Sequence, residues 1–201
     1  MPESLLQLLH NLDWVLPLRR DWLTPLMHGF SLLGYEKFIL FFLPLGYWAW
    51  RRPLFLRLFI LVSVNALLNA YLKDLWQDPR PALAIRLDDL VGASYGLPSG
   101  HAQVAVVLWF WLAYELRRRW ARWLCGFIVA GIMFSRLYLA AHDVEDVLGG
   151  GLIGAAMLLL FAQIKNWRCW SVNYLPWHLV LVVAIGLLSF FAWPGTPPSY
   201  I

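Results

Sequence analysis

The chain has 201 residues, of which 61% are apolar and only 14% are charged. Soluble globular domains average roughly 45–50% apolar and roughly 25% charged residues. A soluble fold of this composition would expose large apolar patches and aggregate, and a disordered chain needs low hydrophobicity together with high charge. The mean hydropathy of +0.61 therefore indicates a polytopic membrane protein.

Six segments are apolar and long enough to be interpreted as membrane-spanning helices, since a helix needs roughly 20 mostly apolar residues to cross a bilayer. Their even spacing and their Gly, Ala and Leu content favour helices over the alternating strands of an outer-membrane barrel. The predicted fold class is all-α, a polytopic transmembrane helical bundle. The predicted spans are Gly34–Trp50, Pro53–Trp76, Ser99–Leu116, Ala121–Ala140, Asp143–Ile164 and Pro176–Trp193.

The first 33 residues contain two shorter apolar runs, within 4–12 and 22–33, which polar residues interrupt. We interpret them as two amphipathic helices that lie at the membrane interface, and a distorted spanning helix is the alternative. The expected organisation is a single membrane domain over residues 1–201. It has interfacial N-terminal helices (1–33), a helical core (34–164) and an additional C-terminal helix (165–201).

Charged residues are divided unevenly between the two sides that these spans define. One side receives nine Lys and Arg residues and a single acidic residue, Glu115, whereas the other side receives seven basic and eleven acidic residues. Basic loops face the cytoplasm, so the second side and both termini are predicted to lie outside. The net charge of +4 is the sum of a basic side and an acidic side, so it does not predict nucleic-acid binding.

Polar residues of the outward side gather in three places, and the first is the end of the second predicted span. Asn65, Asn69 and Lys73 are spaced by four residues and share one helix face. Interhelical hydrogen bonding explains Asn65 and Asn69, and a snorkelling side chain explains Lys73. Lys73 with Arg80, followed by the stiff Pro81, is equally typical of an anion site.

The second place is the segment from Pro98 to His101, which leads directly into the third predicted span. Ser99 is a typical helix N-cap, and Gly100 allows close approach of a bound group to the backbone. The first amides of a helix, at the positive end of its dipole, favour phosphate. His101 is placed to donate a proton there, and an ordinary helix cap beside an interfacial histidine is the alternative.

The third place joins Arg136, near the end of the fourth predicted span, to the start of the fifth. His142 and Asp146 are four residues apart and share a helix face. A carboxylate so placed accepts a hydrogen bond from one ring nitrogen and leaves the other nitrogen as a nucleophile. The alternative is an acidic cluster that complements the helix dipole, which also suits Asp143 and Glu145.

The predicted topology brings all three places to one side of the membrane. Two histidines, three cations and free helix amides are the parts of a phosphoryl-transfer site that works without a metal. His101 and His142 are possible metal ligands, but the cations Lys73, Arg80 and Arg136 disfavour a divalent ion there. We therefore expect no metal and no cofactor.

The motifs are Lys73-x6-Arg80-Pro81, Pro98-Ser99-Gly100-His101 and Ser135-Arg136-x5-His142-x3-Asp146. In order and internal spacing they resemble the three-part signature of the type-2 phosphatidic acid phosphatase family, also called the lipid phosphate phosphatase family. The resemblance covers roughly residues 53–164. It departs from the family in one respect, because members usually have two helices before the first motif helix, whereas one clear span is found here.

The resemblance implies a role for each motif residue and makes 34–164 the catalytic core. His142, held by Asp146, would take the phosphoryl group, and water would then cleave the phosphohistidine. His101 would protonate the leaving oxygen, and the family needs no metal. The residues that would bind phosphate oxygens are Lys73, Arg80, Ser99, Gly100 and Arg136.

The implied function is hydrolysis of a lipid phosphate or diphosphate at the outer, periplasmic or extracellular face of a plasma (inner) membrane. Undecaprenyl diphosphate, phosphatidic acid and phosphatidylglycerol phosphate all fit, with membrane lipids as the expected partners. A lipid-linked phosphotransferase is the nearer alternative, and a non-catalytic lipid or anion transporter is the more distant one. The connection 82–96, with Arg86, Asp88 and Asp89, is expected either to shape headgroup choice or to be a solvated loop.

Overall fold

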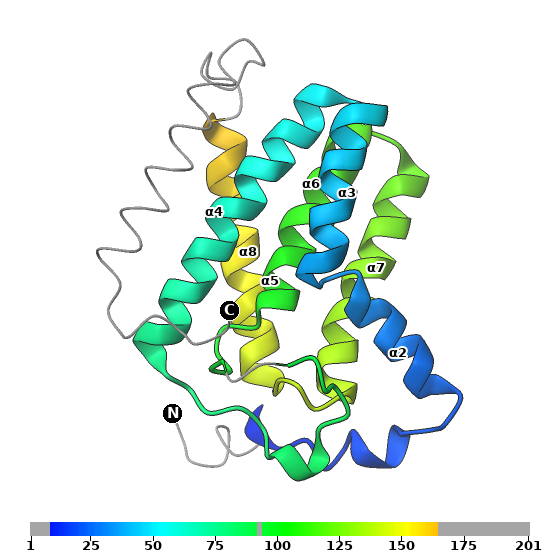
Figure 1. Ribbon diagram of the computed structural model, residues 1–201, viewed down its shortest axis with the longest axis vertical. Coiled ribbons are helices and arrows are strands. Elements are labelled where there is room, and N and C mark those ends of the chain that lie inside the picture. The colour runs from blue at the N-terminus through cyan, green and yellow to red at the C-terminus, as the bar shows by residue number, and fades with distance from the viewer. Residues whose placement is uncertain (1–8, 92–93, 165–201) are drawn as a thin grey trace.

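The computed structural model describes residues 9–91 and 94–164, and every regular element within them is helical (Figure 1). The predicted all-helical fold is thus confirmed for this part of the chain, and the predicted sixth span lies outside it. The α-helices are α2 (Leu23–Leu32), α3 (Glu36–Ala49), α4 (Arg52–Trp76), α5 (Gly100–Ala105), α6 (Trp111–Leu116), α7 (Arg119–Tyr138) and α8 (Val144–Ile164). The remaining elements are two 3-10 turns, η1 (Leu16–Leu18) and η2 (Leu83–Ile85), and a π-helical segment, η3 (Val106–Phe110).

Three of these helices, α4, α7 and α8, are long and apolar enough to cross a membrane. They correspond to the second, fourth and fifth predicted spans. α2 and α3 meet the same test only together, as a pair bent by 53°. α3 corresponds to the first predicted span, Gly34–Trp50, whereas α2 falls in the second apolar run of the N-terminal region, for which the sequence predicts an interfacial helix. The described residues therefore hold three candidate spans, or four with the bent pair, and the predicted count of six is not confirmed.

The third predicted span is a helical run that changes its winding twice. α5, η3 and α6 follow one another from Gly100 to Leu116 and have six, five and six residues. None of its three elements is among the candidate spans, and much of the run is buried, including Val107 and Leu108 with no exposed surface. π-helical segments inside helices are frequent near functional sites, and this one follows directly after the helix start that carries His101.

The outer helices keep large apolar side chains exposed, as a protein solvated by lipid does. Leu40 on α3 is 69% exposed, Trp123 on α7 is 82% exposed and Leu152 on α8 is 71% exposed. In water such a surface would drive aggregation, whereas in a bilayer it contacts hydrocarbon. The exposed tryptophans near helix ends, such as Trp48 and Trp120, agree with the interfacial belt expected of a membrane protein.

Glycines let α8 approach α5 closely. A Cβ atom added to Gly150 would lie 2.4 Å from the carbonyl oxygen of Ser99, and one added to Gly154 would lie 2.7 Å from that of Gln103. The two glycines form a small-xxx-small pair, and they pack helices within the bundle. Their contact holds the start of α5 against the start of α8.

Gly150→Ala is expected to lower the free energy of unfolding by about 1–3 kcal/mol, because the new methyl group would be forced against backbone. Thermal unfolding of the purified protein in detergent measures the change. Gly126→Ala on α7 is the matched control, since a Cβ atom there meets nothing within 4 Å. Equal unfolding temperatures for the two variants would contradict the close helix contact.

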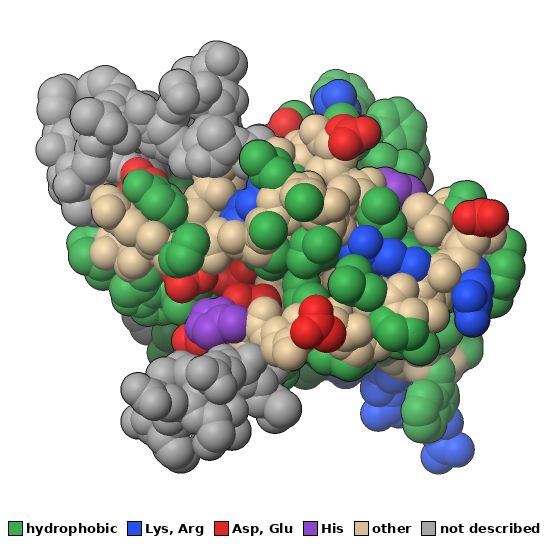
Figure 2. Space-filling model, turned by 90° about the horizontal axis from the view of Figure 1, so that it is seen from below, with side chains coloured by type: hydrophobic (Ala, Val, Ile, Leu, Met, Phe, Trp, Pro, Cys, Tyr) green, Lys and Arg blue, Asp and Glu red, His purple; other side chains and the backbone are tan. Residues whose placement is uncertain are grey.

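The chain brings its three motif regions to the same end of the bundle. The C-terminal ends of α4 and α7 and the N-terminal ends of α5 and α8 all lie at the lower end of the molecule in Figure 1. Figure 2 shows this end, where acidic, basic and histidine side chains are interspersed among apolar ones. The functional site is therefore to be sought where these helix ends meet.

Candidate functional site

A cavity of about 680 Å³ opens at this end, between α3, α4, the start of α5 and the connection that follows α4. Its lining includes six of the eight predicted site residues: Lys73, Arg80, Gly100, His101, Arg136 and His142. The other two lie directly behind the lining, because Asp146 contacts His142 and Ser99 precedes Gly100. The structure thus brings all eight predicted residues together.

His142 lies in the turn before α8, held between a carboxylate and a guanidinium. Its Nδ1 is 2.8 Å from Oδ2 of Asp146, and its Nε2 is 3.1 Å from Nη1 of Arg80. A guanidinium has donors only, so Nε2 of His142 accepts and the ring proton must sit on Nδ1, which donates to Asp146. The nitrogen that faces the cavity therefore carries the lone pair of the ring, which accepts from Arg80 here and which a nucleophile requires.

The surroundings of His142 keep its ring neutral. Burial lowers the pKa of His142 well below its ordinary value of 6.5, and the positive charges of Arg80, Lys73 and Arg136 lower it further. Both effects disfavour the imidazolium, because it would be desolvated and repelled by like charges. The lone pair on Nε2 is consequently available at neutral pH.

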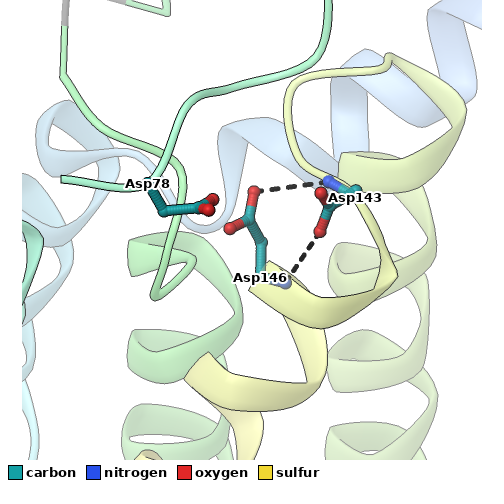
Figure 3. A group of neighbouring side chains, drawn as sticks. All are labelled: Asp78, Asp143 and Asp146. Carbon is teal, nitrogen blue, oxygen red and sulfur yellow. Dashed lines mark hydrogen bonds between the residues drawn. The ribbon is translucent and has the colours of Figure 1, made fainter. Parts of the chain in front are cut away.

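Asp146 also fixes the start of α8. Its Oδ2 accepts from the backbone N–H of Asp143 at 3.3 Å, and its own backbone N–H donates to Oδ1 of Asp143 at 3.0 Å (Figure 3). This reciprocal pair has the geometry of a capping box, with aspartates in place of the usual residues. Both sequence interpretations of the acidic cluster hold, since it caps the helix and orients His142.

Asp78 completes a group of three carboxylates with Asp143 and Asp146, whose ligand atoms lie within 4.8 Å of one another (Figure 3). Carboxylate oxygens are the usual ligands of Mg²⁺ and Ca²⁺. Here Oδ2 of Asp143 already accepts from Nδ1 of His10 at 2.6 Å, while Asp146 serves His142. Burial, then the charge of Asp143, raise the pKa of Asp78. Helix capping and the His142 contact account for the group, and we assign it no metal.

His101 stands in the first turn of α5 and faces the cavity. Its ring packs edge-on against the ring of Tyr35, with 4.3 Å between centroids, and its Nε2 is buried without a hydrogen-bond partner in the described part of the chain. Ser99 is the N-cap of α5, as predicted, and its Oγ accepts from the backbone N–H of Ala102 at 3.5 Å. The backbone N–H of Ser99 donates to the carbonyl oxygen of Asp146 at 2.9 Å, which ties the second motif to the third.

Two of the predicted cations also hold the connection between α4 and α5. Lys73 donates to the carbonyl oxygens of Tyr95 and Gly96. Arg80 donates from Nε to the carbonyl oxygen of Ser94 and from Nη2 to its Oγ, both at 2.6 Å. Burial, with the repulsion of Arg136, lowers the pKa of Arg80 to about 10, so it remains positively charged at neutral pH.

Arg136, the third cation, is only 1% exposed and forms an ion pair with Asp88. Its Nη1 lies 2.7 Å from Oδ2 of Asp88 and donates to Oγ of Ser31. The hydroxyl of Tyr35 donates to the same Asp88 oxygen at 2.7 Å. The solvated-loop interpretation is therefore wrong for Asp88, which is 4% exposed, and it holds for the exposed Asp89.

Sequence reasoning missed Ser31, Tyr35 and Ser94, which complete the surroundings of the cations. None of them belongs to a motif. Ser31 lies in the region interpreted as interfacial, and Tyr35 lies at the start of the first predicted span. The sequence contains one indirect signal, which is that a buried arginine requires a buried anion. That signal does not say which of the eleven outward acidic residues supplies it.

Comparisons with known proteins agree with this site. Residues 53–170 match the PAP2 superfamily. The chain is 31% identical over 162 residues to phosphatidylglycerophosphatase B of Bacillus subtilis, covering 74% of this chain and 77% of that protein. It is 33% identical over 175 residues to sphingosine-1-phosphate phosphatase 2 of Mus musculus, covering 81% of this chain but only 48% of that longer protein.

Two solved structures share the fold. A transmembrane PAP2-type phosphatidylglycerolphosphate phosphatase from Bacillus subtilis superimposes with a TM-score of 0.71 at 24% identity, over 83% of this chain and 90% of that chain. LpxE from Aquifex aeolicus gives a TM-score of 0.63 at 20% identity, over 80% and 93% of the two chains. Because the family match covers more than half of the chain and includes all three motifs that meet at the cavity, this integral membrane protein belongs to the PAP2 superfamily.

Proposed function

We propose that the protein hydrolyses a lipid phosphate or lipid diphosphate at the outer face of the membrane through a phosphohistidine intermediate. The observation that carries the proposal is the cavity itself, in which two histidines and three cations meet at one end of an apolar wall. The two curated relatives reported above are both named as phosphatases, which supports this reaction class.

In the first step, the lone pair on Nε2 of His142 attacks phosphorus. A nitrogen–phosphorus bond forms while the bond from phosphorus to the leaving oxygen breaks. Asp146 retains the hydrogen bond to Nδ1 and stabilises the positive charge that develops on the ring. His101, which the negative charge of the bound phosphate favours in its protonated form, donates a proton to the leaving oxygen, so that a lipid alcohol or a lipid monophosphate departs.

In the second step, water takes the place of the leaving group. His101 accepts a proton from the water molecule while the water oxygen attacks phosphorus. The nitrogen–phosphorus bond breaks at the same time, and its electron pair returns to Nε2 of His142. Inorganic phosphate is released, and both histidines regain their starting protonation. Lys73, Arg80 and Arg136 stabilise the negative charge on the phosphoryl oxygens in both transition states.

The apolar wall of the cavity supports a lipid substrate. Away from the histidines the lining comes from α3 and α4, including Ile39, Leu43, Phe59 and Val62. Leu40, which also lines the cavity, is 69% exposed, so the cavity reaches the surface that faces hydrocarbon. A lipid tail can therefore remain among apolar side chains while its phosphate reaches His142.

The charge distribution supports an outward-facing site in a plasma (inner) membrane. Arg117 and Arg118 lie between α6 and α7, and Arg119 begins α7, at the opposite end of that helix from Arg136. Basic segments of this kind remain on the cytoplasmic side. The site at the other helix ends would then face the periplasm or the extracellular medium.

Phosphate release from a panel of lipids by the purified full-length chain in detergent tests the proposal. The panel contains phosphatidic acid, phosphatidylglycerol phosphate and undecaprenyl diphosphate, each assayed with and without a chelator. We expect release from at least one lipid that is insensitive to chelation. Transfer of phosphate to an added alcohol without release would indicate a phosphotransferase instead, and loss of activity on chelation that metal restores would contradict the metal-free mechanism.

The acid limb of the pH profile of kcat/KM is expected well below pH 6.5. His142 attacks only when neutral, and burial among cations lowers its pKa, so the neutral form persists as the pH falls. Activity should be lost only when the pH drops through this lowered value. The profile of kcat/KM reports groups of the free enzyme, and the titration of the substrate phosphate is measured separately. An acid limb at or above pH 6.5 would contradict the described surroundings of His142.

A further inference from the structure

The apolar part of the cavity contains a polar side chain that the proposed mechanism does not use. Asn65 is 2% exposed and lines the cavity from α4. It precedes Lys73 by two helical turns, which is about 12 Å along the helix axis. Along α4 the lining includes Phe59, Val62 and Ser63 before Asn65, and Ala66, Asn69 and Lys73 after it. Asn65 therefore lies between the cationic end and the hydrocarbon end.

Asn69, one turn along the same face, shows what a structural asparagine does in this bundle. Its Nδ2 donates to the carbonyl oxygen of Pro98 at 3.0 Å and to Oε1 of Gln103 at 2.8 Å. These bonds fasten α4 to the start of α5 and confirm the interhelical role predicted for Asn69. The amide nitrogen of Asn69 is thus satisfied by the protein itself.

Asn65 differs from Asn69 in this respect. Its Oδ1 is buried and has no hydrogen-bond partner within the described residues. Buried polar groups are nearly always paired in native structures, and an unpaired acceptor destabilises the fold that contains it. The side-chain oxygen of Asn65 therefore makes no interhelical bond among the described residues, and an acceptor left unpaired beside a cavity points to a ligand.

We infer that Asn65 forms a polar subsite that binds the linkage group of a lipid phosphate, meaning the group that joins the phosphate to the hydrocarbon tails. This inference rests on the proposed function, because it takes the phosphate to lie at His142. A side-chain amide has both donors and an acceptor, so it can pair with an ester, an amide or a hydroxyl. Such groups occur in lipids built on glycerol or on a long-chain amino alcohol.

The subsite separates two classes of substrate by their chemistry. In a lipid built on glycerol, polar groups lie between the phosphate and the tails. Asn65 has the corresponding position in the cavity, because it lies between Lys73 and the apolar wall. In a polyprenyl phosphate the hydrocarbon begins directly at the phosphate, so that binding buries Asn65 without a partner. A ligand that leaves a buried polar group of the protein unpaired binds more weakly than one that pairs with it, so the site is expected to discriminate against polyprenyl phosphates.

The test compares kcat/KM for phosphatidic acid with kcat/KM for a polyprenyl monophosphate, using the full-length chain in the same detergent. Asn65→Leu removes the amide at similar volume, and we expect the ratio of the two values to fall by about tenfold, through a higher KM for phosphatidic acid. Asn65→Gln retains an amide and should keep most of the preference. Ala66→Leu narrows the same part of the cavity without removing a polar group, so it should affect both substrates alike.

The outcomes separate this inference from the proposed function. If the wild-type enzyme cleaves both lipids and a folded Asn65→Leu variant keeps the wild-type ratio of the two kcat/KM values, the subsite is overturned. The proposed phosphatase function is not affected by that result. An Asn65→Gln variant as unselective as the leucine variant would also overturn the subsite. Failure of the wild-type protein to release phosphate from either lipid would instead contradict the proposed function.

Discussion

Replacing His142 with alanine is expected to reduce phosphate release by at least about 10⁴-fold, as removal of a covalent nucleophile does in other enzymes. The reason is geometric, because Nε2 of His142 is the cavity-facing nitrogen whose lone pair the neighbouring Arg80 leaves unprotonated. Without it no phosphohistidine forms, and the remaining cations stabilise only a direct attack by water. Release of inorganic phosphate from the best substrate of the lipid panel measures the effect.

His142 is buried, so the test needs proof that the variant folds. Its removal also leaves Asp146 without the imidazole partner, and the unfolding temperature and elution profile in detergent must therefore match those of the wild type. His142→Gln fills more of the space and serves as a second variant. His28→Ala is the matched control, because His28 is an exposed histidine of α2 that does not line the cavity. A folded His142 variant with substantial turnover would overturn the assigned role.

The motif spacing predicted the centre of the site because short-range geometry determines it. Residues four apart on a helix or its first turn must be neighbours, and His142 and Asp146 are in hydrogen-bond contact. The cap formed by Ser99 follows equally from its position before Gly100. What spacing cannot supply is the partner of a side chain from another element.

Asn65 and Asn69 illustrate that limit. They have the same residue type, the same helix and the same face, yet Asn69 bonds to α5 and its cap, whereas Asn65 faces the cavity unpaired. The difference depends on how closely α5 approaches each turn of α4, which is a tertiary property. No single-sequence pattern contains it.

The count of spans could not be derived for a related reason. Hydropathy shows that a segment is apolar enough to contact lipid, but a helix that is buried by other helices is equally apolar. Hydropathy therefore does not distinguish the two. The run from α5 to α6 is apolar because protein surrounds it, and α2 with α3 is bent where Gly34 packs against the ring of His101. Both features arise from packing around the site.

Asp88→Ala is expected to lower the free energy of unfolding by about 3–5 kcal/mol, the usual cost of removing one partner of a buried ion pair. Arg136 is 1% exposed and has its only acidic contact among the described residues in Asp88. Truncation would leave the guanidinium charged, desolvated and bonded to Ser31 alone. Thermal and denaturant unfolding in detergent measure the loss, which should greatly exceed that of any exposed carboxylate.

Asp89→Ala supplies that comparison, because Asp89 is the exposed neighbour of Asp88 in the same connection, and its removal should change stability by no more than about 0.5 kcal/mol. A double variant that also replaces Arg136 with methionine should recover much of the loss, since no unpaired charge then remains. Similar losses in the two single variants would contradict the buried pair.

The pH dependence of the Asp88 effect gives an independent check on its cause. Burial acts to raise the pKa of Asp88, but the hydrogen bond from Tyr35 and the charge of Arg136 outweigh it and lower the pKa. A carboxyl group with a lowered folded-state pKa contributes stability that is complete above its unfolded value of about 3.9 and is lost as the pH falls through the folded value. The difference between wild type and Asp88→Ala should therefore be constant near neutrality and shrink only in acid. A difference that vanished between pH 6 and 8 would assign the stability to another titrating group.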